Sequence, residues 1–349
     1  MISEYGMNQD ELKESIPISV LITAYDRREF IMEALKSVVN QNLDRSLYEI
    51  VVVKNFSDRV VDGYISEIGA KSVLSVSSKM GKFICDALPV CSGNVIAFLE
   101  DDDWWSNDRL SIIYNAFTTN EKLGYYHNSV ISVDTNGDAL ENVKLFENGK
   151  EIEKVGTFII RDKEKISSMK RIGRMFPDFN SSSIAIRKKV IANVIEKLRE
   201  IDTAPDTFMF YASLVSDFSI MLDSNKGTYY RHHKKNMSGS YERDTEAKLQ
   251  NLSIFTDRAI QSYGIILRMV SESQRTEFEV YANRRIVFTK ILNHIQRKEI
   301  IRRGMVKLVI SFLRYLTIYD RILNFEALFL SSVYCLSPSC SKKLLLRYL

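Results

Sequence analysis

"NVIAFLEDDDWW" (residues 94–105) joins a run of apolar residues to four consecutive carboxylates, Glu100 to Asp103. The apolar part, residues 94–99, carries no charge and has the length of a strand, as expected for a strand buried on both faces of a parallel sheet. In open α/β sheets, ligands bind at the carboxyl ends of such strands. The stretch therefore predicts an α/β fold with a ligand site directly after this strand.

Strand and helix patterns alternate before this stretch. The alternation consists of expected strands at 18–24, 49–53 and 72–77 and expected helices at 27–41, 59–68 and 81–90. Asp26 and Glu29 predict an N-cap and a capping box for the first helix. A series of βαβ units of this kind predicts a mostly parallel sheet covered by helices.

The pattern changes along the second half of the chain. The elements expected there are a helix at 107–119, strands at 124–133, 138–146, 181–186 and 227–233, and helices at 188–199 and 206–215. From about residue 243, strand signals stop and helical patterns rich in Lys, Arg, Leu and Ile continue to the end. The sequence thus predicts an N-terminal extension at 1–16, an α/β domain at 17–242 and a helical C-terminal region at 243–349.

The four adjacent carboxylates repel one another, so their burial requires a compensating cation or a set of hydrogen-bond donors. Carboxylate oxygens suit hard divalent ions such as Mg²⁺ or Mn²⁺, which commonly bridge to substrate phosphates. A solvated acidic turn that begins the next helix, near Asn107, is the alternative. Both interpretations place the acidic run at the carboxyl edge of the sheet.

Charge and cysteine content limit the class of protein. The formal net charge is +4, and residues 281–349 carry 13 Lys and Arg against three acidic residues. The four cysteines are too sparse for a disulfide framework and lack zinc-site spacing, which favours a reduced cytoplasmic protein. The polar first 15 residues do not resemble a targeting peptide. We expect no nucleic-acid partner.

The basic C-terminal region predicts contact with a membrane surface. Its longest stretch without Lys, Arg, Asp or Glu is Ala327–Ser341, 15 residues, which is shorter than the ~20 needed to span a bilayer. Apolar helices with spaced basic residues suit the membrane interface. The alternatives are an oligomerisation bundle and packing against the α/β domain. We expect no transmembrane helix and peripheral attachment at the inner face of the cell membrane.

Four segments, in order, resemble the family 2 glycosyltransferases, which have the GT-A nucleotide-sugar-binding fold. They are "PISVLITAYDRREFIMEALKSVVNQ" (17–41), "GNVIAFLEDDDWWSNDRL" (93–110), "PDTFMFYASL" (205–214) and "YRHHKKNMS" (230–238). The second is similar to the family's Asp-x-Asp metal motif, and the fourth to its Tyr-Arg-x-His-x-x-Asn-x-Ser segment. The resemblance covers about two thirds of the chain, from about 17 to 240.

The resemblance implies a nucleotide-diphospho-sugar donor and a Mn²⁺ or Mg²⁺ cofactor. It assigns Asp102 and His233 to the metal, with Glu100 as a further candidate ligand in place of the motif's first Asp. The residues that it assigns to donor binding are Thr23, Ala24, Tyr25, Asn55, Asp101 and Arg231. Asp103 is a candidate ligand or helix cap, Trp104 a candidate sugar contact, and Trp105 a candidate core or wall aromatic. His232 is expected to point away from the site, because neighbours in a strand face opposite sides.

Asp206 is the candidate general base. An inverting transfer needs a carboxylate that takes the acceptor's hydroxyl proton, and Asp206 matches the second acid of the family's Glu-Asp pair. The alternative is that Pro205 and Asp206 merely begin a helix. The chain departs from the family here, with Pro205 in place of the first acid, and also at Lys54 and Asn55, which stand where the family has acidic residues.

The sequence therefore predicts an inverting, metal-dependent glycosyltransferase that acts on a glycan or lipid-linked acceptor. The departures leave open a catalytically inactive relative that binds glycans or serves as a scaffold. A nucleotidyltransferase is a third class, but the chain has no glycine-rich phosphate loop of that kind.

Overall fold

A computed structural model describes residues 18–140, 156–172, 175, 177–233, 236 and 245–296. Its centre is a nine-stranded sheet. The strand order is β3 (Lys71–Leu74), β2 (Tyr48–Lys54), β1 (Ile18–Ala24), β4 (Val95–Glu100), β8 (Ile184–Arg187), β6 (Leu123–Val133), β9 (Ser219–Arg231) and β5 (Trp104–Trp105), and β7 (Phe158–Ile160) also pairs with β9.

The sheet is mixed but mostly parallel, as predicted. β1 to β4 run in one direction, and β6 and β9 run with them, because β8 is antiparallel to both β4 and β6. β5 and β7 are antiparallel to β9. The parallel order β3-β2-β1-β4 brings the carboxyl ends of β1, β2 and β4 to one edge, where the acidic run begins.

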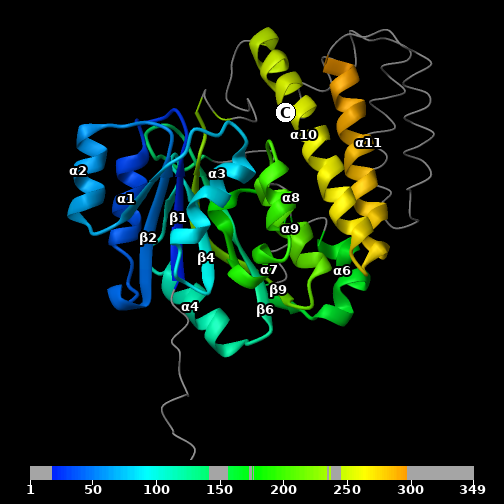
Figure 1. The fold of residues 1–349 in the computed structure, drawn as a ribbon, viewed down its shortest axis with the longest axis horizontal. Helices are drawn as coiled ribbons and strands as arrows, with labels where there is room; N and C mark the ends of the chain where they lie inside the picture. Colours follow the sequence, from blue (N-terminus) through cyan, green and yellow to red (C-terminus); the bar gives the residue numbers. More distant parts are fainter. Residues whose placement is uncertain are drawn as a thin grey trace, which may run out of the picture.

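Helices cover both faces of the sheet (Figure 1). One face packs against α1 (Ile31–Val39), α2 (Arg59–Glu67) and α4 (Arg109–Thr119). The other face carries α3 (Met80–Ala87), α6 (Lys165–Ile172), α7 (Lys188–Ala192), α8 (Ile195–Glu200), α9 (Pro205–Val215), α10 (Thr245–Glu272) and α11 (Glu279–Gln296). The alternation of strand side chains creates these two cores, since Val20 and Ile22 join the first whereas Leu21 joins the second.

Several predicted boundaries need correction. The helix predicted at 27–41 begins at Ile31 with Phe30 as N-cap, so the prediction of Asp26 as the cap was wrong. Asp26 instead has a left-handed φ of 56°, which a cap in the β region does not have. The strand predicted at 181–186 starts as a 3₁₀ turn, Ser181–Ser183, and the helix predicted at 188–199 is divided into α7 and α8.

α10 and α11 lie side by side against the α9 side of the molecule (Figure 1). Their buried side chains, including Ile266, Met269 and Ala282, belong to the same hydrophobic cluster as the sheet's second face. The predicted division at residue 242 stays a prediction. The segment 301–349, on which the membrane prediction depends, lies outside the described residues.

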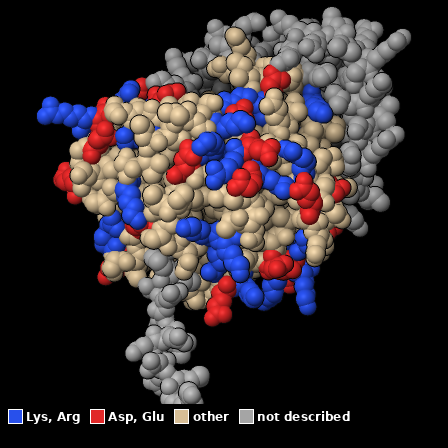
Figure 2. Space-filling model, viewed as in Figure 1, with Lys and Arg blue, Asp and Glu red and all other residues tan. Residues whose placement is uncertain are grey.

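Among the described residues, no helix has both the length and the apolar character needed to cross a membrane. On the face shown in Figure 2, Lys and Arg side chains are interspersed with Asp and Glu. The described surface in this view therefore presents no large patch of one sign.

Candidate active site

The acidic run forms a tight buried turn at the end of β4. The Asp101 amide donates to the Thr23 carbonyl at 3.0 Å, and the Asp103 amide donates to the Glu100 carbonyl at 3.2 Å. Asp101, Asp102 and Asp103 are 1%, 4% and 1% exposed. The alternative of a solvated acidic turn is therefore wrong: these carboxylates are buried, and α4 begins only at Arg109.

Asp103 is held by two hydrogen-bond donors. The Asn180 side-chain amide donates to Oδ2 at 2.8 Å, and the Arg231 backbone amide donates to Oδ1 at 2.9 Å. These bonds connect the turn after β4 to the end of β9 and to the segment before β8. They show that Asp103 does not act as a cap of α4.

Asp101 and Asp102 share one arginine. Arg27 Nε and Nη2 contact Asp101 Oδ1 at 3.1 and 2.5 Å, and Arg27 Nη1 lies 2.7 Å from Asp102 Oδ2. His233 Nε2 lies 2.9 Å from the same Asp102 oxygen. The other oxygen, Asp102 Oδ1, is buried and has no hydrogen-bond partner within the described chain.

The acidic turn fits a divalent metal. Glu100, Asp102 and Asp103 each offer one carboxylate oxygen, and these atoms lie within 4.8 Å of one another. The buried, unpaired Asp102 Oδ1 supplies the second observation, because buried polar atoms normally have partners. An all-oxygen donor set suits Mg²⁺ or Mn²⁺.

The charges of the run are unevenly compensated. Burial raises the pKa of Asp101 and of Asp103 to about 7, with a further contribution from Asp102 in each case. Burial also raises the pKa of Glu100 well above its ordinary value, and the charges of Asp102 and Asp103 add to this. Burial opposes ionisation of Asp102 too, but Arg27 and His233 lower its pKa. Asp102 is therefore the most readily ionised of the four.

Arg231 connects the acidic turn to a set of three aromatic rings, the aromatic column: Phe30, Trp104 and Tyr229. Its guanidinium lies 4.4 Å from the Phe30 ring centroid and 4.5 Å from that of Trp104. Trp104 in turn stacks on Tyr229, with ring centroids 5.0 Å apart and planes 5° apart. Arg231 thus lies between two aromatic rings, which is a favourable cation–π arrangement.

The hydrogen bonds of Arg231 are internal. Nε donates to the Asp102 carbonyl at 3.0 Å, Nη1 donates to the Thr135 carbonyl at 2.8 Å, and Nη2 pairs with Glu33. In this arrangement Arg231 holds the turn from the side of β9. Its predicted contact with the donor stays a prediction.

The two tryptophans after the turn have different surroundings. Trp105 is 2% exposed and its indole Nε1 donates to the Ser182 carbonyl at 2.9 Å, as expected for a core aromatic. Trp104 is partly exposed. His233 contacts Asp102. The ring of His232 instead packs edge-on against that of Tyr230, with ring centroids 4.8 Å apart.

The other residues predicted to bind the donor gather at the same edge. Thr23 and Ala24 end β1, and Tyr25 packs edge-on against Phe83 on α3. Asn55 follows β2 and exchanges two hydrogen bonds with Asp26, at 2.8 and 2.7 Å. This reciprocal pairing fixes the loop that carries Arg27.

Asp206 lies in the first turn of α9, after Pro205 at the first helical position. Asp206 is partly exposed, and its Oδ1 accepts from the adjacent Thr207 amide at 2.7 Å. Burial raises the pKa of Asp206 to about 6, and the charge of Asp178 adds to this. Asp178 accepts from Thr207 Oγ1 at 3.1 Å and pairs with Arg285 of α11.

Three non-glycine residues in the described chain have a positive φ: Asp26 (56°), Asn180 (68°) and Ala204 (56°). Asp26 precedes Arg27, Asn180 donates to Asp103, and Ala204 is the N-cap of the helix that carries Asp206. Backbone strain of this kind costs about 1–3 kcal/mol per residue and clusters at functional sites. Its concentration here supports a functional role for this edge of the sheet.

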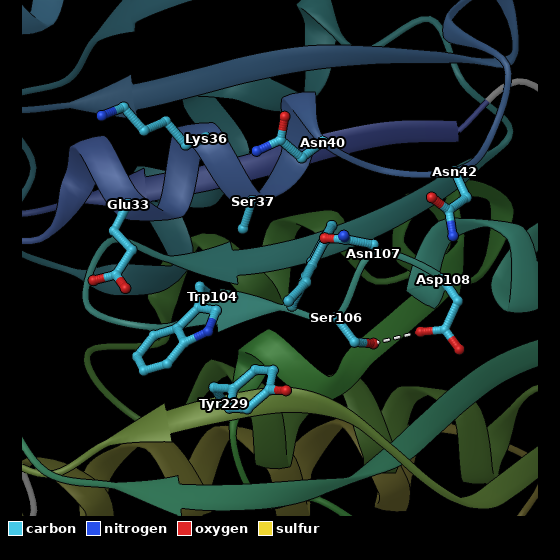
Figure 3. A pocket seen from close by; sticks show the side chains of 11 residues that line it. Glu33, Lys36, Ser37, Asn40, Asn42, Trp104, Ser106, Asn107, Asp108 and Tyr229 are labelled. Carbon is cyan, nitrogen blue, oxygen red and sulfur yellow. Dashed lines mark hydrogen bonds between the residues drawn. The ribbon is translucent and has the colours of Figure 1, made fainter. Parts of the chain in front are cut away.

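A pocket of about 590 Å³ adjoins the aromatic column. Figure 3 shows Glu33 and Ser37 of α1 on one side and Trp104 and Tyr229 on the other. Its remaining lining is mainly amide, hydroxyl and carboxylate side chains: Asn40, Asn42, Ser106, Asn107 and Asp108, together with Lys36 and Trp105. Such groups suit a ligand rich in hydroxyls.

The profile of the family described as "Glycosyl transferase family 2" matches residues 19–177, which include the acidic turn and the β1 edge. This segment of the chain belongs to glycosyltransferase family 2. The chain is 27% identical, over 130 residues, to an uncharacterised glycosyltransferase of Nostoc sp.. That match spans 36% of this chain and 39% of the Nostoc protein, about two fifths of the curated relative's length.

A solved structure shows a similar fold. Residues 1–349 of S. aureus TarS match with a TM-score of 0.50 and 14% identity, covering 91% of this chain and 90% of that one. The mannosyltransferase PcManGT of Pyrobaculum calidifontis, solved with GDP-Man and Mn²⁺, matches with a TM-score of 0.49 and 12% identity, covering 92% and 87%. At these identities the likeness concerns the GT-A-like fold alone.

The sequence did not reveal four residues of the candidate site: Arg27, Asp178, Asn180 and Arg285. Arg27 was hidden because the pattern placed it inside a helix that in fact starts at Ile31. Asp178, Asn180 and Arg285 lack a motif, and only the packing of α9, α11 and the segment before β8 brings them to the site. The only usable signal was the lost acid at Pro205, which calls for another acid near Asp206.

Proposed function

We propose that this protein is an inverting, metal-dependent glycosyltransferase that moves a sugar from a nucleotide-diphospho-sugar to a glycan or lipid-linked acceptor. The observation that carries the proposal is the buried acidic turn with its unpaired Asp102 Oδ1, together with a second carboxylate, Asp206, whose charge acts on Glu100 of the turn and whose own pKa is raised to about 6. The acidic turn suits a metal–diphosphate complex, and Asp206 suits proton abstraction.

Asp102, with Glu100, Asp103 and His233 as neighbours, would hold the metal, which when bound supplies charge neutralisation for the leaving nucleoside diphosphate. The chain's own part is to fix the geometry. Asn180 and the Arg231 amide orient Asp103, and Arg231 holds the Asp102 carbonyl from the other side. The donor's nucleotide is assigned to the edge formed by Thr23, Ala24, Tyr25, Asn55 and Asp101.

Asp206 would accept the proton of the acceptor hydroxyl. A base works best when its pKa is close to the working pH, and a carboxylate with a pKa of about 6 is a stronger base than an ordinary Asp. Asp178 contributes to this value through its negative charge, so it replaces in part the acid that is missing at Pro205. A glycan acceptor is further supported by the hydroxyl-binding character of the pocket beside Trp104 (Figure 3).

Donor hydrolysis tests the proposal against an inactive relative. The full chain is incubated with UDP-, GDP- and dTDP-sugars, with Mn²⁺ or with EDTA, and the release of nucleoside diphosphate is measured. We expect slow release from one donor with Mn²⁺, and a thermal stabilisation of about 2.7 kcal/mol at a donor concentration of ~100 times its dissociation constant. Binding without any hydrolysis or transfer would favour the inactive relative. The absence of both donor binding and donor hydrolysis would contradict the proposal.

Attachment to a membrane surface through the helical C-terminal region, residues 243–349, is part of the same proposal. It is supported by the excess of basic over acidic residues in 281–349. The full chain should float with anionic phospholipid vesicles and be released by high salt. Failure to bind such vesicles would contradict this part and leave the sugar transfer untouched.

A further inference from the structure

We propose that Arg27 is an internal counter-cation that competes with the divalent metal for the acidic turn, and that metal binding frees its guanidinium for the donor's diphosphate. This inference rests on the metal site of the proposed function. It adds a role for a residue that the family motifs do not mark, and it concerns the protein before the donor arrives.

The contacts of Arg27 are those of a shared cation. Two of its nitrogens lie on Asp101 Oδ1 and the third lies 2.7 Å from Asp102 Oδ2. Although burial opposes it, the charges of Asp102 and then Asp101 raise the pKa of Arg27 above its ordinary value. A guanidinium that bonds two carboxylates through different nitrogens makes strong charge-assisted hydrogen bonds, so its removal from the turn has a free-energy cost.

The same carboxylate is the best metal ligand of the turn. Arg27 uses Asp102 Oδ2, and the free oxygen is Asp102 Oδ1 on the same group. A divalent ion on Oδ1 would lie close to the guanidinium and repel it, because two cations would share one anion in a site with little water. Metal and Arg27 therefore bind Asp102 antagonistically, and each lowers the other's affinity by the same factor.

Arg27 is able to leave without unfolding a helix. It lies in the loop between β1 and α1, since α1 begins only at Ile31. The pairing of Asp26 with Asn55 anchors the loop next to Arg27. The backbone thus stays in place while the long side chain, which is 18% exposed, changes its partner.

The next residue gives a matched control. Arg28 belongs to the same loop but is 54% exposed, and it faces Asp58 at 3.7 Å rather than the acidic turn. Arg27→Gln and Arg28→Gln make the same change of charge in adjacent positions. Only Arg27→Gln removes the cation from Asp101 and Asp102.

The first measurement is Mn²⁺ affinity of the donor-free full chain, from the electron paramagnetic resonance signal of free Mn²⁺. We expect Arg27→Gln to bind Mn²⁺ more tightly than the unchanged protein, on the order of tenfold, within the usual range of coupling between sites. Arg28→Gln should bind as the unchanged protein does. Equal or weaker Mn²⁺ binding by Arg27→Gln would overturn the competition, and failure of all three proteins to bind Mn²⁺ would remove the metal from the proposed function as well.

The second measurement tests the freed guanidinium with inorganic pyrophosphate at saturating Mn²⁺. We expect Arg27→Gln to bind pyrophosphate more weakly than the unchanged protein and Arg28→Gln to match it. Equal pyrophosphate affinity in Arg27→Gln would overturn the second half of the proposal. Thermal unfolding in EDTA confirms that each variant is folded; should Arg27→Gln fail to fold, Arg27→Lys, which keeps the charge but loses the fork, should show Mn²⁺ affinity above that of the unchanged protein.

Discussion

Asp102 and Asp206 are the two carboxylates of the proposed mechanism, and their surroundings differ. Asp102 is 4% exposed and has Arg27 and His233 on one oxygen, so its pKa is lowered. Asp206 is partly exposed and has another acid, Asp178, as its neighbour, so its pKa is raised to about 6. A carboxylate kept ionised is suited to hold a cation, and one kept close to neutrality is suited to exchange a proton.

The largest expected effect comes from replacing Asp102. Asp102→Asn removes the ionised group of the turn and should reduce transfer by about 10⁴-fold, because the metal's stabilisation of the leaving group amounts to several kcal/mol. The dependence on Mn²⁺ should disappear together with the activity. The measurement is transfer rate and donor affinity at several Mn²⁺ concentrations; donor binding with unchanged metal dependence would show that Asp102 is not the ligand.

The next effect concerns Asp206. Asp206→Asn should lower transfer by ~10²–10⁴-fold, the usual contribution of a general base, while donor affinity stays nearly constant. Asn begins a helix about as well as Asp, so the stability of α9 should not change. The dissociation constant for the donor and the transfer rate are measured on the same preparation, and a normal rate would leave the base unassigned.

A smaller effect is the pH dependence of the unchanged protein. Asp206 must be ionised to accept a proton, so kcat/KM should fall about tenfold per pH unit as the pH drops below about 6. Donor affinity is measured over the same range as a control. A rate that is flat from pH 7 to pH 5 would be inconsistent with Asp206 as the base.

The smallest expected effect sharpens the comparison. Two variants should shift the acidic limb of the pH profile, the pH below which kcat/KM falls, in opposite directions. Asp178→Asn removes a negative neighbour of Asp206 and should move the limb to lower pH, whereas Arg285→Gln removes a positive one and should move it to higher pH. Shifts of both variants in the same direction would mean that general destabilisation, rather than charge, changes the profile. Thermal unfolding of both variants provides the control.

The sequence predicted the surroundings of the acidic turn better than those of Asp206. The strands around 18–24, 49–53 and 94–99 and the acidic turn were predictable, since apolar runs followed by polar residues determine both burial and edge position. The position of Arg27 was not predictable, because the helical periodicity begins at residue 27, four residues before α1 itself begins. The left-handed backbone at Asp26 and its pairing with Asn55 keep this segment in a loop.

The surroundings of Asp206 depend on contacts between segments far apart in the chain. Asp178 and Arg285 are separated by more than 100 residues and meet because α11 packs against the sheet's second face. No local pattern encodes such a pair. The role of Trp104 was also undetermined, since its stacking between Arg231 and Tyr229 requires β5 and β9 to be neighbours.

The contribution of α11 has a consequence for exchanging parts between relatives. The family profile ends at residue 177, before Asp178, Asp206 and Arg285. A hybrid that joined residues 19–177 to the second half of another glycosyltransferase would keep the acidic turn but replace Asp206 together with its charged neighbours Asp178 and Arg285. A crossover between Met175 and Asp178 would thus separate the acidic turn from Asn180, Arg231 and His233, which contact it.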